Sequence, residues 1–194
     1  MMKKYFMFML AMMAFGLTTT TSEANDMKKA VFAGGCFWCM EAAFDKMDGV
    51  VETISGFTGG HVVNPSYKQV VKGDTGHLEA VEVTYDADKI SYVDLLEVYW
   101  GNVDPLDAQG QFCDKGSSYK PAIFVSDDNQ RALAEASKVK IQEKYEDDVK
   151  VAIHDLDVFY DAEEEHQDYH EKNPFHYELY YDRCGRKERL EELK

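Results

Sequence analysis

The stretch that most constrains the fold of this chain is residues 34–39, which read GGCFWC. The apolar run Ala30–Ala33 precedes it and is typical of a buried strand. After it, apolar residues recur through Met47 with the spacing of one face of an α-helix. The two glycines therefore predict a tight turn from a strand into a helix, with Cys36 in the first helical turn.

This placement makes Cys36 a candidate nucleophile. The free N–H groups at a helix N-terminus and the positive end of the helix macrodipole favour an anion. A cysteine there is expected to have a lowered pKa, and the thiolate is the nucleophilic form. The alternative is a buried structural cysteine, which would need neither the two glycines before it nor the Phe37-Trp38 pair after it.

The chain has four cysteines, which are Cys36, Cys39, Cys113 and Cys184. In an exported protein, four cysteines are compatible with two structural disulfides. A domain of this size can nevertheless fold without such cross-links. The C-x-x-C spacing of Cys36 and Cys39 is also that of redox motifs, so we favour redox chemistry.

The N-terminus has the pattern of a secretory signal peptide. Lys3 and Lys4 are followed by an uncharged apolar run over Tyr5–Leu17, and then by small polar residues ending at Ala24. The apolar run is too short for a stable membrane anchor. We therefore predict a signal peptide at residues 1–24, cleaved near Ala24, and one catalytic domain at residues 25–194 that is exported to the periplasm or the medium.

The chain is strongly acidic, with a formal net charge of −15 at pH 7. This charge argues against nucleic acids and anionic membranes as partners.

The rest of the chain predicts a mixed fold. Buried strands are expected at Val50–Phe57, Leu78–Tyr85, Ala122–Val125 and Val149–Ile153, and helices at Ser91–Trp100 and Ser126–Tyr145. The order strand, helix, strand, strand, helix, strand is that of an α+β, ferredoxin-like split β-α-β sandwich. We expect a long, coil-rich C-terminal tail from about Tyr145, with a short helix near residues 163–171.

Glu79 is the second candidate site residue. It alternates along its strand with the same phase as Val81 and Val83, so its side chain is predicted to point toward the core. Burial would raise its pKa and make it a proton donor near neutral pH. The alternative is a partly solvated position at the end of the strand, beside His77.

Two long loops, at residues 61–76 and 101–120, carry Tyr67 and Tyr119 respectively, and Asp114 lies in the second loop. The tyrosines either cover the surface or donate hydrogen bonds to a substrate oxygen. His166 and His170 have a spacing that can bind a metal, but an acidic, solvated helix explains them better. No metal site is therefore predicted.

Five blocks of the sequence occur in the order in which one protein family has them: GCFW at 35–38, NPSY at 64–67, TGHLEAV at 75–81, FCD at 112–114 with Tyr119, and the run from EHQ at 165–167 to Pro174. Through these blocks, the chain resembles the A-type peptide methionine sulfoxide reductases over nearly all of residues 30–193.

The resemblance implies reduction of the S epimer of methionine sulfoxide, free or in proteins, without a metal or an organic cofactor. It implies that Cys36 attacks the sulfur, that Glu79 protonates the oxygen, and that Tyr67 and Tyr119 hold this oxygen. Asp114 would support the site. The family pattern also implies that Phe37 and Trp38 form the pocket for the substrate methyl group. Cys36 would become a sulfenic acid and then a disulfide, which a thioredoxin-like protein would reduce. We expect a monomer.

The resolving cysteine stays open. Many relatives have glycine at position 39, cysteine is not usual at position 113, and only Cys184 lies near the end of the tail. We rank Cys39 first because it is one helical turn from Cys36, then Cys184, then Cys113. Two rival functions are a thiol–disulfide oxidoreductase and an exported binding module with structural disulfides.

Overall fold

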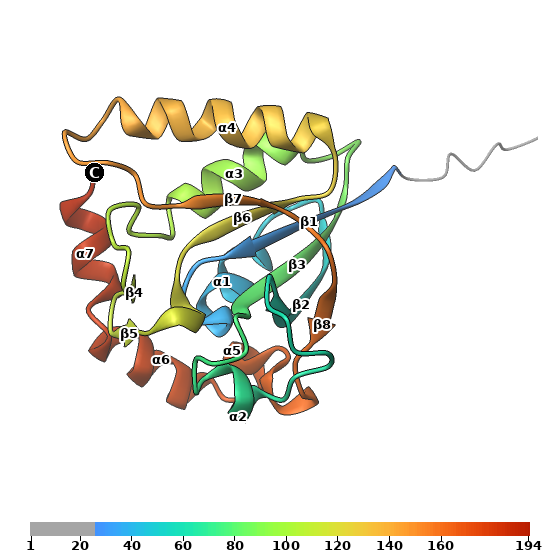
Figure 1. Ribbon diagram of the computed structural model, residues 1–194, viewed down its shortest axis with the longest axis vertical. Coiled ribbons are helices and arrows are strands. Elements are labelled where there is room, and N and C mark those ends of the chain that lie inside the picture. The colour runs from blue at the N-terminus through green and yellow to red at the C-terminus, as the bar shows by residue number, and fades with distance from the viewer. Residues whose placement is uncertain (1–25) are drawn as a thin grey trace, which may run out of the picture.

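The computed structural model describes residues 26–194 (Figure 1). The predicted signal peptide, with its cleavage site near Ala24, lies outside these residues. Within the described part of the chain, no helix combines the length and the apolar character that crossing a membrane would require.

A mixed sheet of six strands forms the centre of the fold, in the order β7-β6-β1-β3-β2-β8. The four middle strands are β6 (Ala122–Val125), β1 (Met27–Ala33), β3 (Leu78–Asp86) and β2 (Val50–Thr58). Each of these four is antiparallel to its neighbours among them. This is the strand order of a split β-α-β sandwich, so the predicted fold class is confirmed.

Three helices cover one face of the sheet: α1 (Phe37–Phe44), α3 (Tyr92–Trp100) and α4 (Asp128–Gln142). Side chains along β1 alternate between the two faces of the sheet, so Ala30 and Phe32 both point into the core beneath these helices. Helix α3 begins with the predicted capping box at Ser91. The N-cap of α4 is Asp127, one residue after the predicted Ser126.

The other face of the sheet carries a much smaller apolar cluster. It consists of Val31, Ala33, Ala80, Ala122 and Phe124. Three of these five residues are alanines, so the apolar layer on this face is thinner than the core on the other face.

The tail adds two strands at the edges of the sheet. Strand β7 (Ala152–Asp155) runs parallel to β6, and it begins later than the strand predicted at Val149–Ile153. Strand β8 (Phe159–Asp161) pairs antiparallel with β2 at the opposite edge. The tail therefore crosses from one edge of the sheet to the other, as Figure 1 shows.

Beyond the strands the tail is largely helical, which corrects the coil-rich tail expected from the sequence. Its helices are α5 (Tyr169–Lys172), α6 (Pro174–Arg183) and α7 (Arg186–Glu192), which follow a 3-10 turn, η2 (Glu164–His166). Pro174 occupies the first turn of α6, where the missing N–H costs nothing. Gly185 separates α6 from α7 with a φ of 67°.

The two long loops contain short elements. The first loop holds α2 (Tyr67–Val70), and the second holds a small hairpin, β4 (Gly110–Gln111) and β5 (Asp114–Lys115), followed by a 3-10 turn, η1 (Ser117–Tyr119).

A disulfide between Cys113 and Cys184 ties this hairpin to the end of α6, across a sequence separation of 71 residues. The tail also contacts the main body at its far end, where the Tyr145 hydroxyl donates to the carbonyl of Leu193 at 2.8 Å.

We predict that the double variant Cys113→Ser/Cys184→Ser lowers the free energy of unfolding by about 2–4 kcal/mol, because the cross-link restricts the unfolded chain. Denaturant unfolding without reductant measures the difference. Wild-type protein treated with dithiothreitol is the control and should shift by the same amount. Equal midpoints for the oxidised wild type and the double variant would contradict a stabilising cross-link.

Candidate active site

The glycine turn brings Cys36 to the start of α1, between the end of β1 and Phe37. Gly35 has a φ of 83°, and a Cβ atom on it would lie 2.5 Å from the Cβ of Gln111. Only glycine fits such a position. Cys36 is the N-cap residue of α1, and its carbonyl accepts the N–H groups of Cys39 at 3.2 Å and Met40 at 3.4 Å. The predicted strand–turn–helix arrangement is confirmed.

Glu79 points into the core beside this turn. Its side chain is buried, with an exposed fraction of 1%. Its Oε2 accepts the N–H of Phe37 at 3.2 Å, whereas Oε1 has no hydrogen-bond partner. Burial raises the pKa of Glu79 to about 8, although the Phe37 N–H and the Tyr119 hydroxyl lower it in part. The predicted inward orientation is confirmed, and the solvated alternative beside His77 is wrong because His77 is buried as well.

The pKa of Cys36 moves in the direction opposite to the sequence expectation. Burial raises the pKa of the Cys36 thiol, and its contact with Cys39 and the nearby carboxyl groups of Glu79 and Asp114 raise it further. The expected lowering considered only the helix N-terminus. In the folded chain, apolar surroundings and negative neighbours outweigh that effect.

The neighbouring thiol behaves differently. Cys39 has its pKa lowered by a hydrogen bond from Cys36 and by the positive charge of Arg186, against the effect of its own burial. Of the two thiols, Cys36 therefore holds its proton more tightly than Cys39 does.

The two loop tyrosines and Asp114 meet at Glu79. Burial raises the pKa of Tyr67 to about 12, although the nearby Tyr119 hydroxyl lowers it in part. Asp114 accepts a hydrogen bond from the Tyr180 hydroxyl, and burial raises the pKa of this carboxyl. Loops separated in the sequence thus supply hydroxyl donors beside one protonated carboxyl.

Phe37 forms the floor of the aromatic part of the site. It is fully buried and packs against Phe57, Tyr67 and His166, with ring centroids 5.9, 6.1 and 5.4 Å away. His166 has its pKa lowered by burial, and its Nδ1 has no partner. It therefore belongs to the aromatic cluster as a neutral ring.

Trp38 is half-buried and forms the wall of the aromatic part. It stacks on Tyr169 with ring centroids 3.7 Å apart and meets the edge of Tyr180 at 5.9 Å. The sequence pair Phe37-Trp38 thus contributes one side chain to the core and one to a partly open aromatic wall.

The histidine pair does not gather metal ligands. His166 lies in the aromatic cluster, and His170 faces Asp45 with its Nε2 3.6 Å from the carboxylate. Among the described residues, one group of possible ligands does come together, at Cys113, Asp114 and Cys184. Its two sulfur atoms are bonded to each other, so they are not free to bind a metal ion.

This bond joins two of the three candidate resolving cysteines and leaves only Cys39 as a free thiol among them. Cys113 and Cys184 are joined in a disulfide, whereas Cys36 and Cys39 are free and buried.

The tail contributes site residues that the sequence reasoning missed. Tyr177 and Tyr180 on α6 face the two thiols, and Arg186 on α7 is buried near Cys39. Two signals were available: Asn173-Pro174 is a typical helix start, and tyrosines recur after it with helical spacing.

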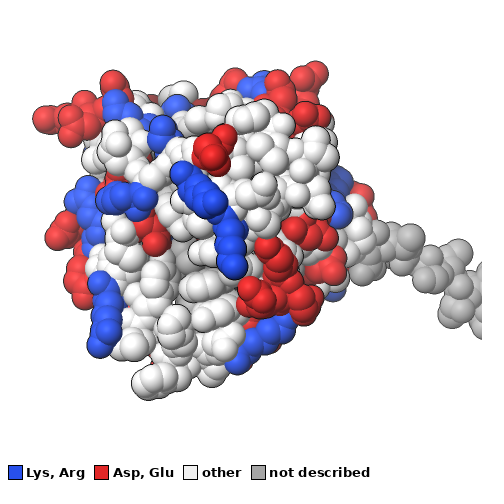
Figure 2. All heavy atoms as spheres, turned by 60° about the horizontal axis from the view of Figure 1, so that its bottom comes forward, with Lys and Arg blue, Asp and Glu red and all other residues white. Residues whose placement is uncertain are grey.

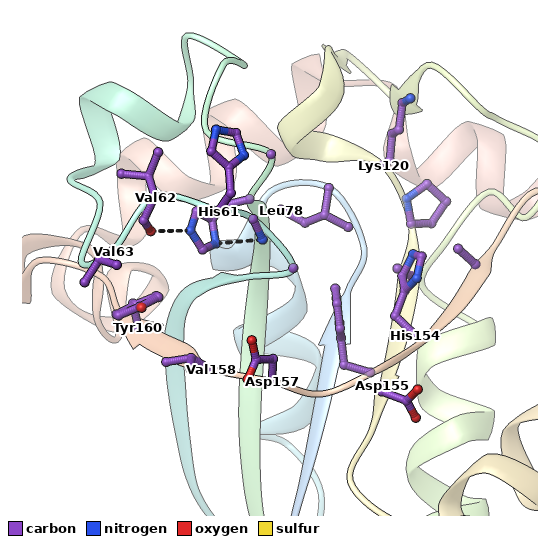
Figure 3. A pocket seen from close by; sticks show the side chains of 18 of the residues that line it. His61, Val62, Val63, Leu78, Lys120, His154, Asp155, Asp157, Val158 and Tyr160 are labelled. Atoms are coloured by element: carbon purple, nitrogen blue, oxygen red, sulfur yellow. Dashed lines mark hydrogen bonds between the residues drawn. The ribbon is translucent and has the colours of Figure 1, made fainter.

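A cavity of about 750 Å³ lies away from this site, beside the small apolar cluster on the other side of the sheet. Figure 3 shows His61, Val62 and Tyr160 on one side of it, and Lys120 and His154 on the other. His77 reaches it, but both ring nitrogens are engaged, with the carbonyl of Val62 at 2.7 Å and the N–H of Gly60 at 3.2 Å. This histidine is held in place rather than poised for proton transfer.

Comparison with known proteins relates the whole catalytic region to one family. The family model "Peptide methionine sulfoxide reductase" matches residues 28–194. The peptide methionine sulfoxide reductase MsrA of Limosilactobacillus reuteri is 52% identical over 153 residues, which cover 77% of this chain and 87% of that protein.

Two solved structures are also similar to this chain. Mxr1 from Saccharomyces cerevisiae in its reduced form has a TM-score of 0.73 and 31% identity, and the match covers 77% of this chain and 87% of that one. Mxr1 in complex with Trx2 has a TM-score of 0.53 and 21% identity, covering 79% and 91%.

We predict that Glu79 is protonated at pH 7 and ionises with a midpoint near pH 8, because its buried carboxyl has no cation beside it. The carboxyl band in the infrared difference between wild type and Glu79→Gln reports this titration. Glu82→Gln, on the same strand, is the matched control and should leave the Glu79 titration unchanged. A midpoint below pH 5 would contradict the desolvated environment.

Proposed function

Because the chain belongs to the peptide methionine sulfoxide reductase family, we propose that it reduces the S epimer of methionine sulfoxide, in proteins or as the free amino acid, and so repairs oxidised proteins. The observation that carries this proposal is the buried Glu79 beside the N-cap thiol of Cys36. A sulfoxide oxygen leaves poorly until it is protonated, and a carboxyl group with a pKa near 8 is a competent donor at neutral pH. Plain thiol–disulfide exchange would not need this acid.

In the first step, the sulfur of Cys36 attacks the sulfoxide sulfur and gives up its thiol proton, while Glu79 transfers its proton to the oxygen. A bond forms between the two sulfur atoms, the sulfur–oxygen bond breaks, and the oxygen leaves as water. Water then attacks the Cys36 sulfur, the bond between the two sulfur atoms breaks, methionine leaves, and Cys36 becomes a sulfenic acid while a proton returns to Glu79. The substrate sulfur is reduced by two electrons and Cys36 is oxidised by two, so the step is balanced without a metal or an organic cofactor.

The surrounding side chains hold the substrate for this step. Tyr67 and Tyr119 keep their protons, since burial raises the pKa of both, and can donate hydrogen bonds to the oxide oxygen. Trp38 offers its half-buried face to the methyl group, and Phe37 supports it from below. Asp114 holds Tyr180 at the rim through its hydrogen bond.

In the second step, the Cys39 sulfur attacks the sulfur of the Cys36 sulfenic acid. A disulfide forms, the sulfur–oxygen bond breaks, and the oxygen leaves as water after taking up a proton. Cβ atoms one turn apart in a helix are about 5–6 Å apart, whereas a disulfide needs about 3.5–4.5 Å. Cys36 is the N-cap, with a φ of −55° and a ψ of 120°, so it is already outside the helical conformation and has freedom to approach.

A thioredoxin-like protein then reduces the Cys36–Cys39 disulfide by thiol–disulfide exchange. The complex of Mxr1 with Trx2 supports a reductant of this class for the fold. Cys113 and Cys184 are a structural cross-link in this scheme and do not cycle.

Oxidised proteins fit the surface that leads to the site. Figure 2 brings forward the end of the molecule that carries α2, α5 and α6, and much of this face is uncharged despite the net charge of −15. Phe175 on α6 is 80% exposed. Such a surface would accept chain segments of varied charge. We further propose that the protein acts as a monomer outside the cytoplasm, after loss of residues 1–24.

We predict that Glu79→Gln slows the reduction step by about 10²–10⁴-fold, the usual range for general acid catalysis. Glutamine matches the shape of the carboxyl group, so the fold should survive. Single-turnover reduction of the separate sulfoxide epimers measures the effect, with Glu82→Gln as the matched control. In the wild type, the rate should fall as the pH rises through about 8, because the acid is lost. A rate for Glu79→Gln equal to that of the wild type would end the acid role.

We predict that Cys39→Ser still reduces one equivalent of sulfoxide but loses turnover with a thioredoxin-like reductant, because no thiol remains to resolve Cys36. Cys113→Ser/Cys184→Ser should keep that turnover, and Cys36→Ser should lose both activities. Peptide mapping after one turnover should show a Cys36–Cys39 bond. Sustained cycling by Cys39→Ser, or a Cys36–Cys184 bond in the wild type, would show that the tail resolves the sulfenic acid.

A further inference from the structure

Arg186 is a buried cation in an unusual setting. It begins α7 and is 1% exposed, the largest of the fully buried side chains. Within the described residues it forms no ion pair with a carboxylate, and its Nε has no hydrogen-bond partner. Burying a charge without a counter-ion is costly, so such a residue requires an explanation beyond packing.

Neutral groups hold the guanidinium in place. Its Nη2 donates to the carbonyl of Asn102 and contacts the sulfur of Met40 at 3.5 Å, and its Cζ lies 4.4 Å from the centre of the Phe112 ring. A carbonyl, a thioether and an aromatic face all attract the cation without neutralising it. Its positive charge therefore acts on the groups around it: it lowers the pKa of the Asp114 carboxyl, and it also acts on one further neighbour.

Cys39 is that neighbour. Met40, which the guanidinium contacts, follows it directly in α1. Asn102, which accepts the hydrogen bond from Arg186, lines a cavity of about 460 Å³ together with Cys39 and Tyr177. Arg186 contacts Met40 and Asn102, which are both neighbours of Cys39, although Arg186 and Cys39 come from different ends of the chain.

We infer that Arg186 is a positioning residue for the second step: its buried charge favours the thiolate form of Cys39 beside Cys36. This role rests on the proposed function, in which Cys39 resolves the sulfenic acid. A thiolate, not a thiol, attacks sulfur in such reactions, so a cation beside the resolving sulfur speeds disulfide formation at neutral pH.

Several other titratable and charged groups surround Cys39 and affect its pKa. Its titratable and charged neighbours are Cys36, Glu79, Asp114, Tyr177, Tyr180 and Arg186, and Lys46, Glu178, Tyr181 and Asp182 line the same cavity. Hydrogen bonding from Cys36 and then the charge of Arg186 lower the pKa of Cys39, whereas Asp114 raises it. After the hydrogen bond from Cys36, the charge of Arg186 is thus the main effect that opposes the burial of Cys39 and the carboxyl group of Asp114.

The cross-link in the tail fixes this cation. Cys184 is two residues before Arg186, and its bond to Cys113 anchors the end of α6 to the hairpin. The Phe112 ring against the guanidinium is next to that same Cys113. The disulfide therefore restrains both Arg186 and the Phe112 ring that it contacts.

The test measures the Cys39 thiol directly. In Cys36→Ser protein with the Cys113–Cys184 bond intact, Cys39 is the one free thiol, and the serine hydroxyl can still donate a hydrogen bond to it. Ultraviolet thiolate absorbance against pH gives its pKa. Adding Arg186→Met should raise this pKa by about one unit or more, the effect of removing a nearby opposite charge. Lys187→Met, which removes an exposed positive charge at the next position, is the matched control and should cause no shift.

Arg186→Lys keeps the charge and should keep the pKa within a few tenths of a unit, and it also serves if the methionine variant does not fold. An unchanged pKa in folded Arg186→Met, or an equal rise in Arg186→Lys, would overturn the role of the charge.

Kinetics supply the second readout. In protein that retains Cys36, Arg186→Met should slow disulfide formation after one turnover by about tenfold at pH 7, as expected for a pKa shift of about one unit. The rate should recover at higher pH, and the preceding reduction step should be unchanged. Loss of both steps, or slowing that persists at every pH, would indicate a structural role and contradict the inference. Sustained cycling by Cys39→Ser would instead contradict the proposed role of Cys39 as the resolving thiol. In that case the titration would still measure the effect of Arg186 on the pKa of Cys39.

Discussion

Removal of the Glu79 carboxyl from water is the interaction on which the rest of the site depends. Burial raises the pKa of Glu79 to about 8, so this carboxyl group holds a proton at neutral pH, which the proposed mechanism gives to the sulfoxide oxygen. The same burial keeps the proton on Cys36. In the proposed mechanism, Cys36 therefore keeps its proton at rest. It loses that proton only when the substrate oxygen takes the proton of Glu79, so the nucleophile and the acid are activated together.

Much of this arrangement could be predicted from the sequence, because its signals are local. The glycine pair before Cys36 and the strict alternation along β3 place the nucleophile and the acid at adjacent points of one sheet. The strand and helix order was enough to predict the sandwich. Tyr67 and Tyr119 came from the blocks of the family resemblance, since nothing in their own loops distinguishes them from surface tyrosines.

What the sequence did not predict depends on contacts between distant segments. Local polarity suggested a coil for the tail, yet tyrosines on α6 find a buried surface only where the rest of the fold provides one. The pairing of Cys113 with Cys184 likewise follows from tertiary structure. The pKa of Cys36 was expected to fall because a helix N-terminus can be read from sequence, whereas a shell of acidic and apolar neighbours cannot.

The contact between Arg186 and Met40 spans 146 residues and joins the last helix to the first. The helix that bears both thiols is therefore covered by a segment from the other end of the chain. Proteolytic loss of α6 and α7 would remove Tyr177, Tyr180 and Arg186 from their places beside Cys36 and Cys39.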